Sequence, residues 1–269
     1  MVAPEGERQQ DRSRAGLGFM STDSRLWKTI GRQLHHPCGV AGRLVGHAMA
    51  LANRRPNRIA IDALKIASSD TVLELGFGPG RAIRTLNAMV PRGLVLGIDH
   101  SVAMLAQASR YNRHAIRIGR VKLQQGHFDA LPWGPDSVDK ILAVNVVYFF
   151  RADAAEIREA RRVLRPGGMM AIYATDKSAM GRWKFSNPET HHIFDRDDLR
   201  ALILNGGAAN DEVSVCSVVL PFQVTGVLAI FRKGTDGAHR STPSVPQRSA
   251  AVGIGGKAEL VGARSNRCA

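Results

Sequence analysis

The stretch Val72-Leu-Glu-Leu-Gly-Phe-Gly-Pro-Gly-Arg81 decides how this chain folds. It begins as a short apolar run, of the kind that a strand buried on both faces of a parallel sheet requires. Three glycines at alternate positions end the run, so the chain must turn sharply at the carboxyl edge of the sheet. Gly76 can adopt backbone angles that a Cβ atom forbids, Gly78 lets the main chain approach a ligand, and Gly80 lets the next helix pack near the strand. Pro79 suits the first turn of that helix, where its missing N–H would have no partner.

The chemistry of this turn differs from that of a dinucleotide-binding fingerprint. A G-x-G-x-x-G pattern counted from Gly76 would need its third glycine at Arg81. Glu74 stands just before the glycines, where a carboxylate would repel a pyrophosphate and attract an ammonium or sulfonium group. S-adenosylmethionine carries both cations, and its carboxylate can accept hydrogen bonds from the N–H groups of the loop and the helix N-terminus. The residues therefore predict a site for S-adenosylmethionine; a purely structural strand-to-helix turn is the alternative.

A second acidic residue follows at an informative spacing. Asp99 ends the apolar run 94–98 and lies about 20 residues beyond the glycine-rich turn, where a βαβ unit places an acid that accepts hydrogen bonds from ribose hydroxyls. The alternative is that Asp99, or Ser101, caps the helix that follows. A helix cap and a ribose contact are compatible, and we favour the ribose role for Asp99.

Strand-like and helix-like segments alternate along the chain. This alternation predicts right-handed βαβ crossovers and a mostly parallel, doubly wound α/β sheet of the Rossmann-like type. Only Leu220-Pro221 and immediate neighbours separate the last two strands, and so short a connection requires an antiparallel hairpin. We therefore expect seven strands, with the seventh antiparallel. The expected strands are 72–75, 94–98, 121–125, 137–147, 169–173, 212–219 and 222–231, and the expected helices are 40–53, 56–67, 81–89, 102–118, 154–164 and 199–204.

The periodic segments define the domain organisation. Residues 1–35 lack apolar periodicity apart from a short helix near 25–33, and we expect them to be a partly disordered tail. One domain follows over 36–233, and its first part, 36–67, supplies capping helices that cover the sheet and the ligand cleft or act as a lid over the substrate. The region 234–269 is rich in Gly, Ser, Pro and Arg and is expected to be a disordered tail.

Charge and cysteine content bear on partners and compartment. The 269 residues carry a net charge of +14, which raises the question of nucleic acid. The arginines are scattered, however, and groups such as Arg158, Arg161, Arg162 and Arg165 have the helical spacing of a solvated face without interleaved aromatic residues. We therefore expect no nucleic-acid partner.

The cysteines Cys38, Cys216 and Cys268 are far apart and have no metal-binding spacing, so we expect reduced thiols and no metal. The first 20 residues contain no apolar core of an export signal, and no apolar run is long enough to span a membrane. These features predict a cytoplasmic protein. They do not indicate its oligomeric state.

Together these segments resemble the class I S-adenosylmethionine-dependent methyltransferases, in particular the small-molecule, methyltransferase type 11-like group that also holds quinone- and sterol-type C-methyltransferases. The resemblance covers roughly residues 38–233. Five motifs stand in the family's order: the glycine-rich turn with Glu74, Gly76, Gly78 and Gly80, then Gly97–Ser101, Asp129–Trp133, Ser137–Asp139 and Arg161–Gly168. The family's fold is the mostly parallel sheet expected above.

The resemblance implies further contacts to the cofactor. His100 would lie against the adenine and ribose, and Phe128 and Asp129 would meet the adenine edge. The backbone near Val144 and Asn145 would face the methionine moiety. For Asp129 the alternative from the residues alone is a turn-forming aspartate before Leu131-Pro132.

Two differences from other branches of the family reduce the number of possible substrate classes. Amino-methylating nucleic-acid enzymes carry Asn/Asp-Pro-Pro-aromatic after the fourth strand, and this chain has Asn145-Val-Val-Tyr148 there. A cytosine C5 enzyme needs a Pro-Cys pair downstream of the glycine-rich loop, and the pair Pro37-Cys38 lies upstream. We therefore expect methyl transfer to a small organic molecule by in-line displacement. A non-catalytic S-adenosylmethionine-binding protein and a nucleic-acid methylase are the alternatives.

The sequence identifies no catalytic base. Because the methyl group of the cofactor is already activated, alignment of the reactants can supply most of the catalysis, and a base is optional. If the acceptor is a hydroxyl, the candidates for removing its proton are His127, Tyr148, His191 and His192. Each of these residue types is more often a surface or packing residue.

Overall fold

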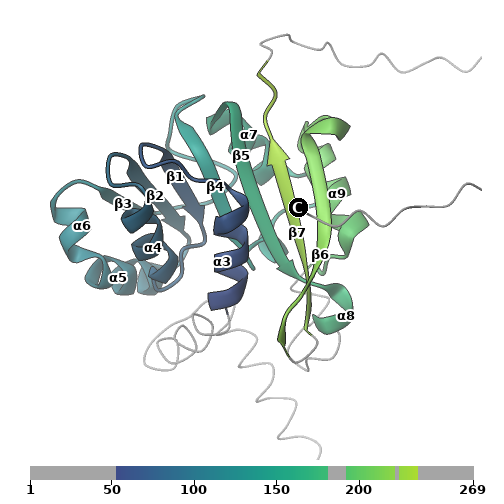
Figure 1. The fold of residues 1–269 in the computed structure, drawn as a ribbon, viewed down its shortest axis with the longest axis horizontal. Helices are drawn as coiled ribbons and strands as arrows, with labels where there is room; N and C mark the ends of the chain where they lie inside the picture. Colours follow the sequence, from purple (N-terminus) through teal and green to yellow (C-terminus); the bar gives the residue numbers. More distant parts are fainter. Residues whose placement is uncertain (1–52, 181–191, 222–223, 236–269) are drawn as a thin grey trace, which may run out of the picture.

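A computed structural model gives the fold, and it describes residues 53–180, 192–221 and 224–235. Several expected features lie outside these residues. They are the tail and short helix expected within 1–35, residues 40–52 of the first capping helix, and residues 236–269 of the expected C-terminal tail. Figure 1 shows the described part as a twisted sheet with helices on both sides.

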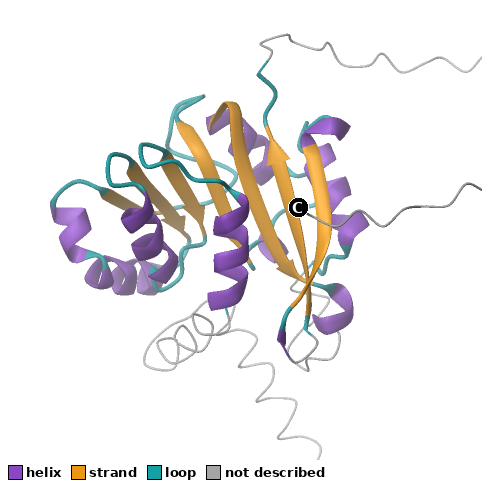
Figure 2. Cartoon of the chain, viewed as in Figure 1, coloured by secondary structure: helices purple, strands orange, loops and turns teal. Residues whose placement is uncertain are grey.

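Seven strands form one sheet in the order β3-β2-β1-β4-β5-β7-β6. β3, β2, β1, β4 and β5 pair in parallel, whereas β7 pairs antiparallel with β5 and β6, so the expectation of one antiparallel strand is confirmed. Figure 2 shows the strands side by side. The strands are β1 (Thr71–Leu75), β2 (Leu94–Asp99), β3 (Val121–Gln125), β4 (Val138–Val144), β5 (Leu164–Thr175), β6 (Val213–Val219) and β7 (Thr225–Arg232).

The side chains of β1 alternate between the two faces of the sheet and so divide the core. Leu73 and Leu75 belong to the buried cluster that includes residues of α7 and α9, and Val72 belongs to the cluster that includes residues of α3, α4 and α5. α3 also contacts β4 and β5 and lies in front of the sheet in Figure 1. The helices are α3 (Arg54–Ala63), α4 (Arg81–Met89), α5 (Val102–Tyr111), α6 (Arg113–Arg117), α7 (Ala155–Val163), α8 (Lys177–Met180) and α9 (Arg196–Asn205), with 3₁₀ turns η1 (Val147–Phe149) and η2 (Asn210–Glu212).

The prediction of one helix over 102–118 is wrong, because this segment forms two helices, α5 and α6, that meet at Asn112. The Asn112 side chain donates hydrogen bonds to the carbonyl oxygens of Ala108 and Gly80, at 2.9 and 3.0 Å. It thereby caps α5 and ties the helix end to the glycine-rich turn. Gly119, at φ +77°, lies just beyond α6 as expected of a helix-ending glycine.

The fifth strand also begins earlier than its expected start at Met169. β5 starts at Leu164, directly after α7, and Leu164 pairs with Val138 of β4. The Gly167 N–H donates to the Lys233 carbonyl at 2.8 Å, and the Lys233 N–H donates to Gly168 at 3.0 Å. Residues 165–168, which we expected only to end a helix, are thus part of β5 and bond the residue that follows β7.

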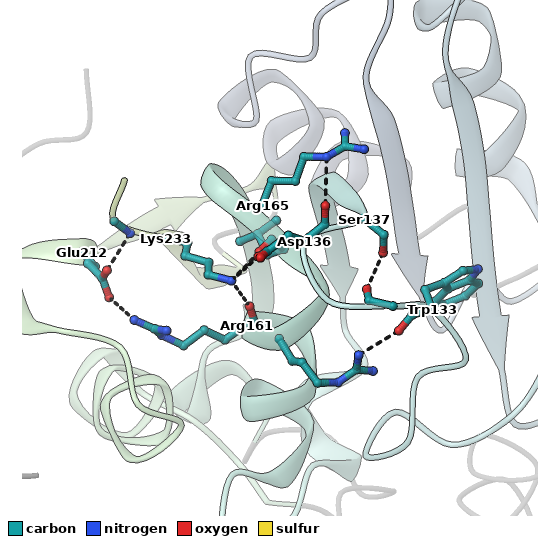
Figure 3. A network of polar contacts seen from close by, with 11 residues as sticks. Trp133, Asp136, Ser137, Arg161, Arg165, Glu212 and Lys233 are labelled. Atoms are coloured by element: carbon teal, nitrogen blue, oxygen red, sulfur yellow. Dashed lines mark hydrogen bonds and ion pairs between the residues drawn. The ribbon is translucent and has the colours of Figure 1, made fainter. Parts of the chain in front are cut away.

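A polar network joins the start of β5 to the end of β7 (Figure 3). The Lys233 ammonium donates to the Asp136 carboxylate at 2.7 Å and to the Leu164 and Arg161 carbonyl oxygens at 2.7 and 3.0 Å. The Gly234 N–H donates to Glu212 at 2.7 Å. The contacts that hold the last strand therefore reach past residue 233, and we extend the proposed domain to residue 234.

The arginines expected to form a solvated face are partly exposed, and they also form ion pairs with carboxylates. Arg165 contacts Asp139 at 2.5 Å, and Arg161 contacts Glu212 at 3.6 Å. Arg162 contacts Glu159 at 2.7 Å, and Arg158 contacts Asp153 at 3.9 Å. Carboxylates of the same chain therefore balance the charge of the arginines around α7, and these arginines need no anionic ligand.

Three expectations concern cysteines, metals and membranes. Cys216 in β6 is disulfide-bonded, so the expectation of reduced thiols is wrong for this residue. Within the described ranges, no cluster of His, Cys, Asp and Glu side chains could hold a metal ion. No helix in the same part of the chain has the length and apolar character needed to cross a membrane.

Candidate functional site

The glycine-rich turn links β1 to α4 and leaves an open approach at its centre. Gly78 has φ +52°, and a Cβ atom there would meet nothing within 4 Å. A Cβ on Gly76 would lie 2.7 Å from the Val146 side chain, and one on Gly80 would lie 2.7 Å from the Ala108 Cβ. The turn is therefore packed at both ends and open at Gly78, as ligand approach requires.

Two details of the expected turn are wrong. Gly80 permits close packing of α5, through Ala108, rather than of the helix that follows the turn. α4 begins at Arg81 with Gly80 as its N-cap, so Pro79 lies before the helix and not in its first turn. The physical reason is that Gly80 has φ +78°, a left-handed conformation that a helix interior excludes.

Asp99, at the end of β2, forms hydrogen bonds that stabilise the glycine-rich turn. One carboxylate oxygen accepts from the Gly78 N–H and the other from the Ser101 N–H, both at 2.9 Å. Ser101, and not Asp99, is the N-cap of α5, with its hydroxyl accepting from the Met104 N–H at 3.4 Å. Burial raises the pKa of Asp99, and the hydrogen bonds from Ser101 and Gly78 and the neighbouring His100 oppose that rise.

Glu74 lies on the face of β1 that α3 and α4 cover. Its side chain is buried, at 5% exposure, and its Oε2 atom has no hydrogen-bond partner among the described residues. Burial, followed by the charge of Asp99, holds the pKa of Glu74 well above its ordinary value. An unpaired buried carboxylate is costly, and a cationic donor would satisfy it. The residues present therefore fit an ammonium-bearing ligand.

These residues meet in a pocket that encloses about 810 Å³, counting the part open to solvent. Seven of the ten predicted cofactor-binding residues line the pocket: Glu74, Gly76, Gly78, Asp99, His100, Val144 and Asn145. The sequence thus predicted the floor of the pocket from the ends of β1, β2 and β4.

Three predicted residues do not line this pocket. Gly80 contacts α5, as described above. Phe128 is buried in the core, with its ring centroid 6.0 Å from that of Phe150. Asp129 lies 3.7 Å from the guanidinium of Arg151. The structure does not bring Phe128 and Asp129 to the pocket, and their contact with the adenine edge stays a prediction.

Asn145, at the end of β4, has φ +53°, a conformation unusual outside glycine. Its Oδ1 atom accepts from the Tyr148 hydroxyl at 2.8 Å and from the Thr175 N–H at 3.1 Å. Its Nδ2 atom donates to Oδ1 of Asn53 at 2.7 Å. The Oδ1 atom of Asn145 therefore accepts from two donors, and its Nδ2 atom joins β4 to the residue that precedes α3.

The four candidate bases differ in their surroundings. The Tyr148 hydroxyl donates to Asn145 and accepts from the Thr175 N–H at 2.6 Å, and burial raises its pKa. His127 and His192 are exposed. His191 lies outside the described residues. Of these candidates, Tyr148 bonds a residue that lines the pocket, Asn145.

Sequence reasoning missed Asn53 and Asn57, which line the pocket from the α3 side. The Asn57 N–H donates to the Asn53 carbonyl at 2.9 Å, so the two side chains lie one helical turn apart on the same face. Two amides on the buried side of a capping helix are a signal that could have found them. Arg81 and Phe149 also line the pocket without having been predicted there.

Comparisons with known proteins agree with this site. A methyltransferase domain model matches residues 72–168. The chain is 32% identical over 136 residues to the uncharacterized methyltransferase YdaC of Bacillus subtilis, covering 51% of this chain and 73% of that protein. It is 30% identical over 123 residues to a trans-aconitate 2-methyltransferase of Methylobacterium nodulans, covering 45% of each chain.

A solved structure of a SAM dependent methyltransferase from Aquifex aeolicus shares the fold, with a TM-score of 0.53 and 20% identity over 65% of this chain and 89% of that one. The sheet with its antiparallel β7, the open turn at Gly78 and the unpaired carboxylate of Glu74 all agree with S-adenosylmethionine as the cofactor. This chain belongs to the class I S-adenosylmethionine-dependent methyltransferases.

Proposed function

We propose that this methyltransferase acts on a small organic molecule. The observation that carries the proposal is the engagement of Asn145, whose amide bonds Asn53, Tyr148 and Thr175. The corresponding place in amino-methylating nucleic-acid enzymes must hold the target nitrogen, and here the Asn145 oxygen that could accept from it already accepts from Tyr148 and Thr175. The relative named for trans-aconitate supports a small acceptor.

The roles of the pocket residues follow from their chemistry. Glu74 binds the ammonium of the methionine moiety and Asp99 binds the ribose. The methionine carboxylate binds the N–H groups of the first turn of α4, because the Gly78 N–H already donates to Asp99. When bound, S-adenosylmethionine supplies a methyl group already activated by its sulfonium. The protein's task is then to align the acceptor and exclude water, and such positioning can supply about 7 to 11 kcal/mol.

A dedicated base is not part of the proposal. The ordinary pKa of a tyrosine hydroxyl is 10.0, and burial raises the pKa of Tyr148 further. The hydroxyl is therefore protonated at neutral pH and acts by holding Asn145. His127 and His192, which are exposed, are candidates only for a hydroxyl acceptor.

The test separates turnover from binding alone. The full chain is incubated with radiolabelled S-adenosylmethionine and a panel of small carboxylic acids, phenols and amines, and S-adenosylhomocysteine binding is measured in parallel. Transfer of label to a small acceptor supports the proposal. Tight cofactor binding without transfer to any acceptor class would favour a non-catalytic cofactor-binding protein.

The nucleic-acid alternative needs its own test, because an aromatic residue lies among basic residues other than the arginines around α7. The guanidinium groups of Arg81 and Arg84 lie 5.8 and 5.2 Å from the ring centroid of exposed Tyr111, so an aromatic residue does interleave with basic ones on α4 and α5. The absence of a nucleic-acid partner stays our prediction. Binding of a single-stranded oligonucleotide that falls steeply with salt would contradict it.

We propose the cytoplasm as the compartment. The disulfide of Cys216 weighs against this proposal, because disulfides are rare in reducing compartments. Cell fractionation locates the protein. Thiol labelling after acid quench, on protein isolated from its own cell, then shows whether Cys216 is oxidised or reduced there.

A further inference from the structure

Two oxygen atoms in the cofactor pocket lack hydrogen-bond partners within the described part of the chain. They are Oε2 of Glu74 and Oδ1 of Asn57, and both are shielded from solvent. Both residues line the pocket, Glu74 from β1 and Asn57 from α3. Buried acceptors without donors are rare in folded proteins, so two of them in one pocket indicate a missing donor.

An unpaired amide alone does not make a ligand site. The Oδ1 atom of Asn87 also lacks a partner among the described residues, yet Asn87 does not line the pocket. What distinguishes Asn57 is its place in the pocket with a carboxylate that has the same unmet requirement.

The helix that carries Asn57 is fixed in place at the pocket. Asn53, one turn before Asn57, accepts a hydrogen bond from Nδ2 of Asn145 at 2.7 Å. Asn145 in turn is held by the Tyr148 hydroxyl and the Thr175 N–H. α3 is therefore tied to the carboxyl end of β4 by a contact between residues 92 positions apart in the chain.

We propose that Asn57 is a cofactor-binding residue, which together with Glu74 binds the ammonium group of the methionine moiety of S-adenosylmethionine. An ammonium group has three N–H donors and no acceptor, and a carboxylate oxygen and an amide oxygen are both suitable partners. α3 then contributes directly to the cofactor site, and the contact between Asn53 and Asn145 holds it in the binding position. This inference rests on the proposed role of Glu74 in the cofactor site.

The experiment compares three ligands by isothermal titration calorimetry on the full chain. S-adenosylhomocysteine carries both the ammonium and the carboxylate, and decarboxylated S-adenosylmethionine carries the ammonium without the carboxylate. 5′-Methylthioadenosine carries neither. The variants are Asn57→Ala and, as a matched control, Asn87→Ala, which removes a partnerless amide oxygen outside the pocket.

Asn57→Ala is expected to weaken binding of both ammonium-bearing ligands by about tenfold or more, since it removes a hydrogen bond to a charged group. Binding of 5′-methylthioadenosine should change less than about twofold, which also shows that the variant is folded. Asn87→Ala should leave all three affinities unchanged.

Equal weakening of all three ligands, or no change for S-adenosylhomocysteine, would overturn the role of Asn57. Weakening of S-adenosylhomocysteine but not of the decarboxylated ligand would also overturn it, because the group held would then be the carboxylate. Failure of the unaltered chain to bind any of the ligands would instead overturn the cofactor site itself.

Discussion

The Asp99 carboxylate accepts a hydrogen bond from the backbone N–H of Gly78 at 2.9 Å, which joins the end of β2 to the open centre of the glycine-rich turn. The same carboxylate accepts from the Ser101 N–H with its other oxygen. Asp99 therefore shapes the turn in addition to the role that we propose for it with the ribose. Substituting it should affect both the turn and the ligand.

Asp99→Ala and Asp99→Asn should separate these two effects. Asparagine retains one acceptor oxygen, so one of the two N–H groups keeps its partner, whereas alanine leaves both without one. We expect Asp99→Ala to weaken S-adenosylhomocysteine binding by about 1.5 to 3 kcal/mol or more, and Asp99→Asn to weaken it less. Calorimetry measures the affinities. An unchanged affinity for Asp99→Ala would place the ribose contact elsewhere.

The raised pKa of Glu74 predicts opposite pH dependences for stability and for cofactor binding. The folded protein without ligand holds the Glu74 proton more tightly than the unfolded chain does, so the free energy of unfolding should fall as pH rises above the ordinary value of 4.5 toward the raised pKa. A cationic ligand favours the ionised carboxylate. The affinity for S-adenosylhomocysteine should therefore rise across the same pH range.

Glu74→Gln is the control for this prediction, because glutamine does not titrate. Its unfolding free energy and its affinity should lack the Glu74 contribution to the pH dependence, and its affinity should be lower than that of the unaltered chain at neutral pH. Chemical denaturation and calorimetry at several pH values provide both curves. Identical pH curves for the variant and the unaltered chain would show that Glu74 does not titrate in this range.

The sequence predicted the sheet and most of the pocket floor, because these depend on local patterns. β2, β4, β5 and β7 contain apolar runs, and Glu74, Gly78 and Asp99 stand at or just after strand ends that a parallel sheet brings to one edge. The antiparallel β7 followed from the short connection at Leu220-Pro221. Such features need no knowledge of distant contacts.

What the sequence did not predict depends on partners that are far apart along the chain. α5 ends at Asn112 because that side chain bonds the Gly80 carbonyl, 32 residues away. The left-handed conformation of Asn145 is compatible with hydrogen bonds to Asn53 and Thr175, which come from two other elements. No local pattern encodes these contacts.

The polar network around Lys233 predicts a stability effect far from the pocket. Lys233→Met should destabilise the protein by roughly 2 to 3 kcal/mol, because the Asp136 carboxylate and the Leu164 and Arg161 carbonyl oxygens lose a charged donor. Lys122→Met, at an exposed lysine of β3, is the matched control. Urea denaturation measures both variants, and equal effects would mean that the network does not stabilise the end of β7.

The backbone conformation of Asn145 predicts a difference between two truncating substitutions. Both Asn145→Gly and Asn145→Ala remove the side-chain hydrogen bonds, but only alanine must also adopt φ near +53° with a Cβ atom. That conformation costs roughly 1 to 2 kcal/mol for a residue other than glycine. We therefore expect Asn145→Ala to be less stable than Asn145→Gly in urea denaturation. The reverse order would show that the backbone relaxes when the side chain is lost.

Tyr148→Phe tests whether the buried hydroxyl removes a proton from the acceptor or only positions Asn145. The Tyr148 hydroxyl, whose pKa is raised above its ordinary value, is protonated at neutral pH, where it donates to Asn145 and accepts from the Thr175 N–H. In the variant, Thr175 can still donate to Asn145, at 3.1 Å. We therefore expect a loss of stability of about 1 kcal/mol and a modest fall in kcat/KM.

The pH profile of kcat/KM distinguishes the two roles of Tyr148. A positioning role leaves the shape of the profile unchanged, because no group that titrates in catalysis has been removed. A general base typically contributes about 10² to 10⁴-fold to the rate, and its loss would also abolish the ionisation that it causes in the profile. A loss of that size together with a changed profile for Tyr148→Phe would therefore assign the base to Tyr148 and contradict the positioning role.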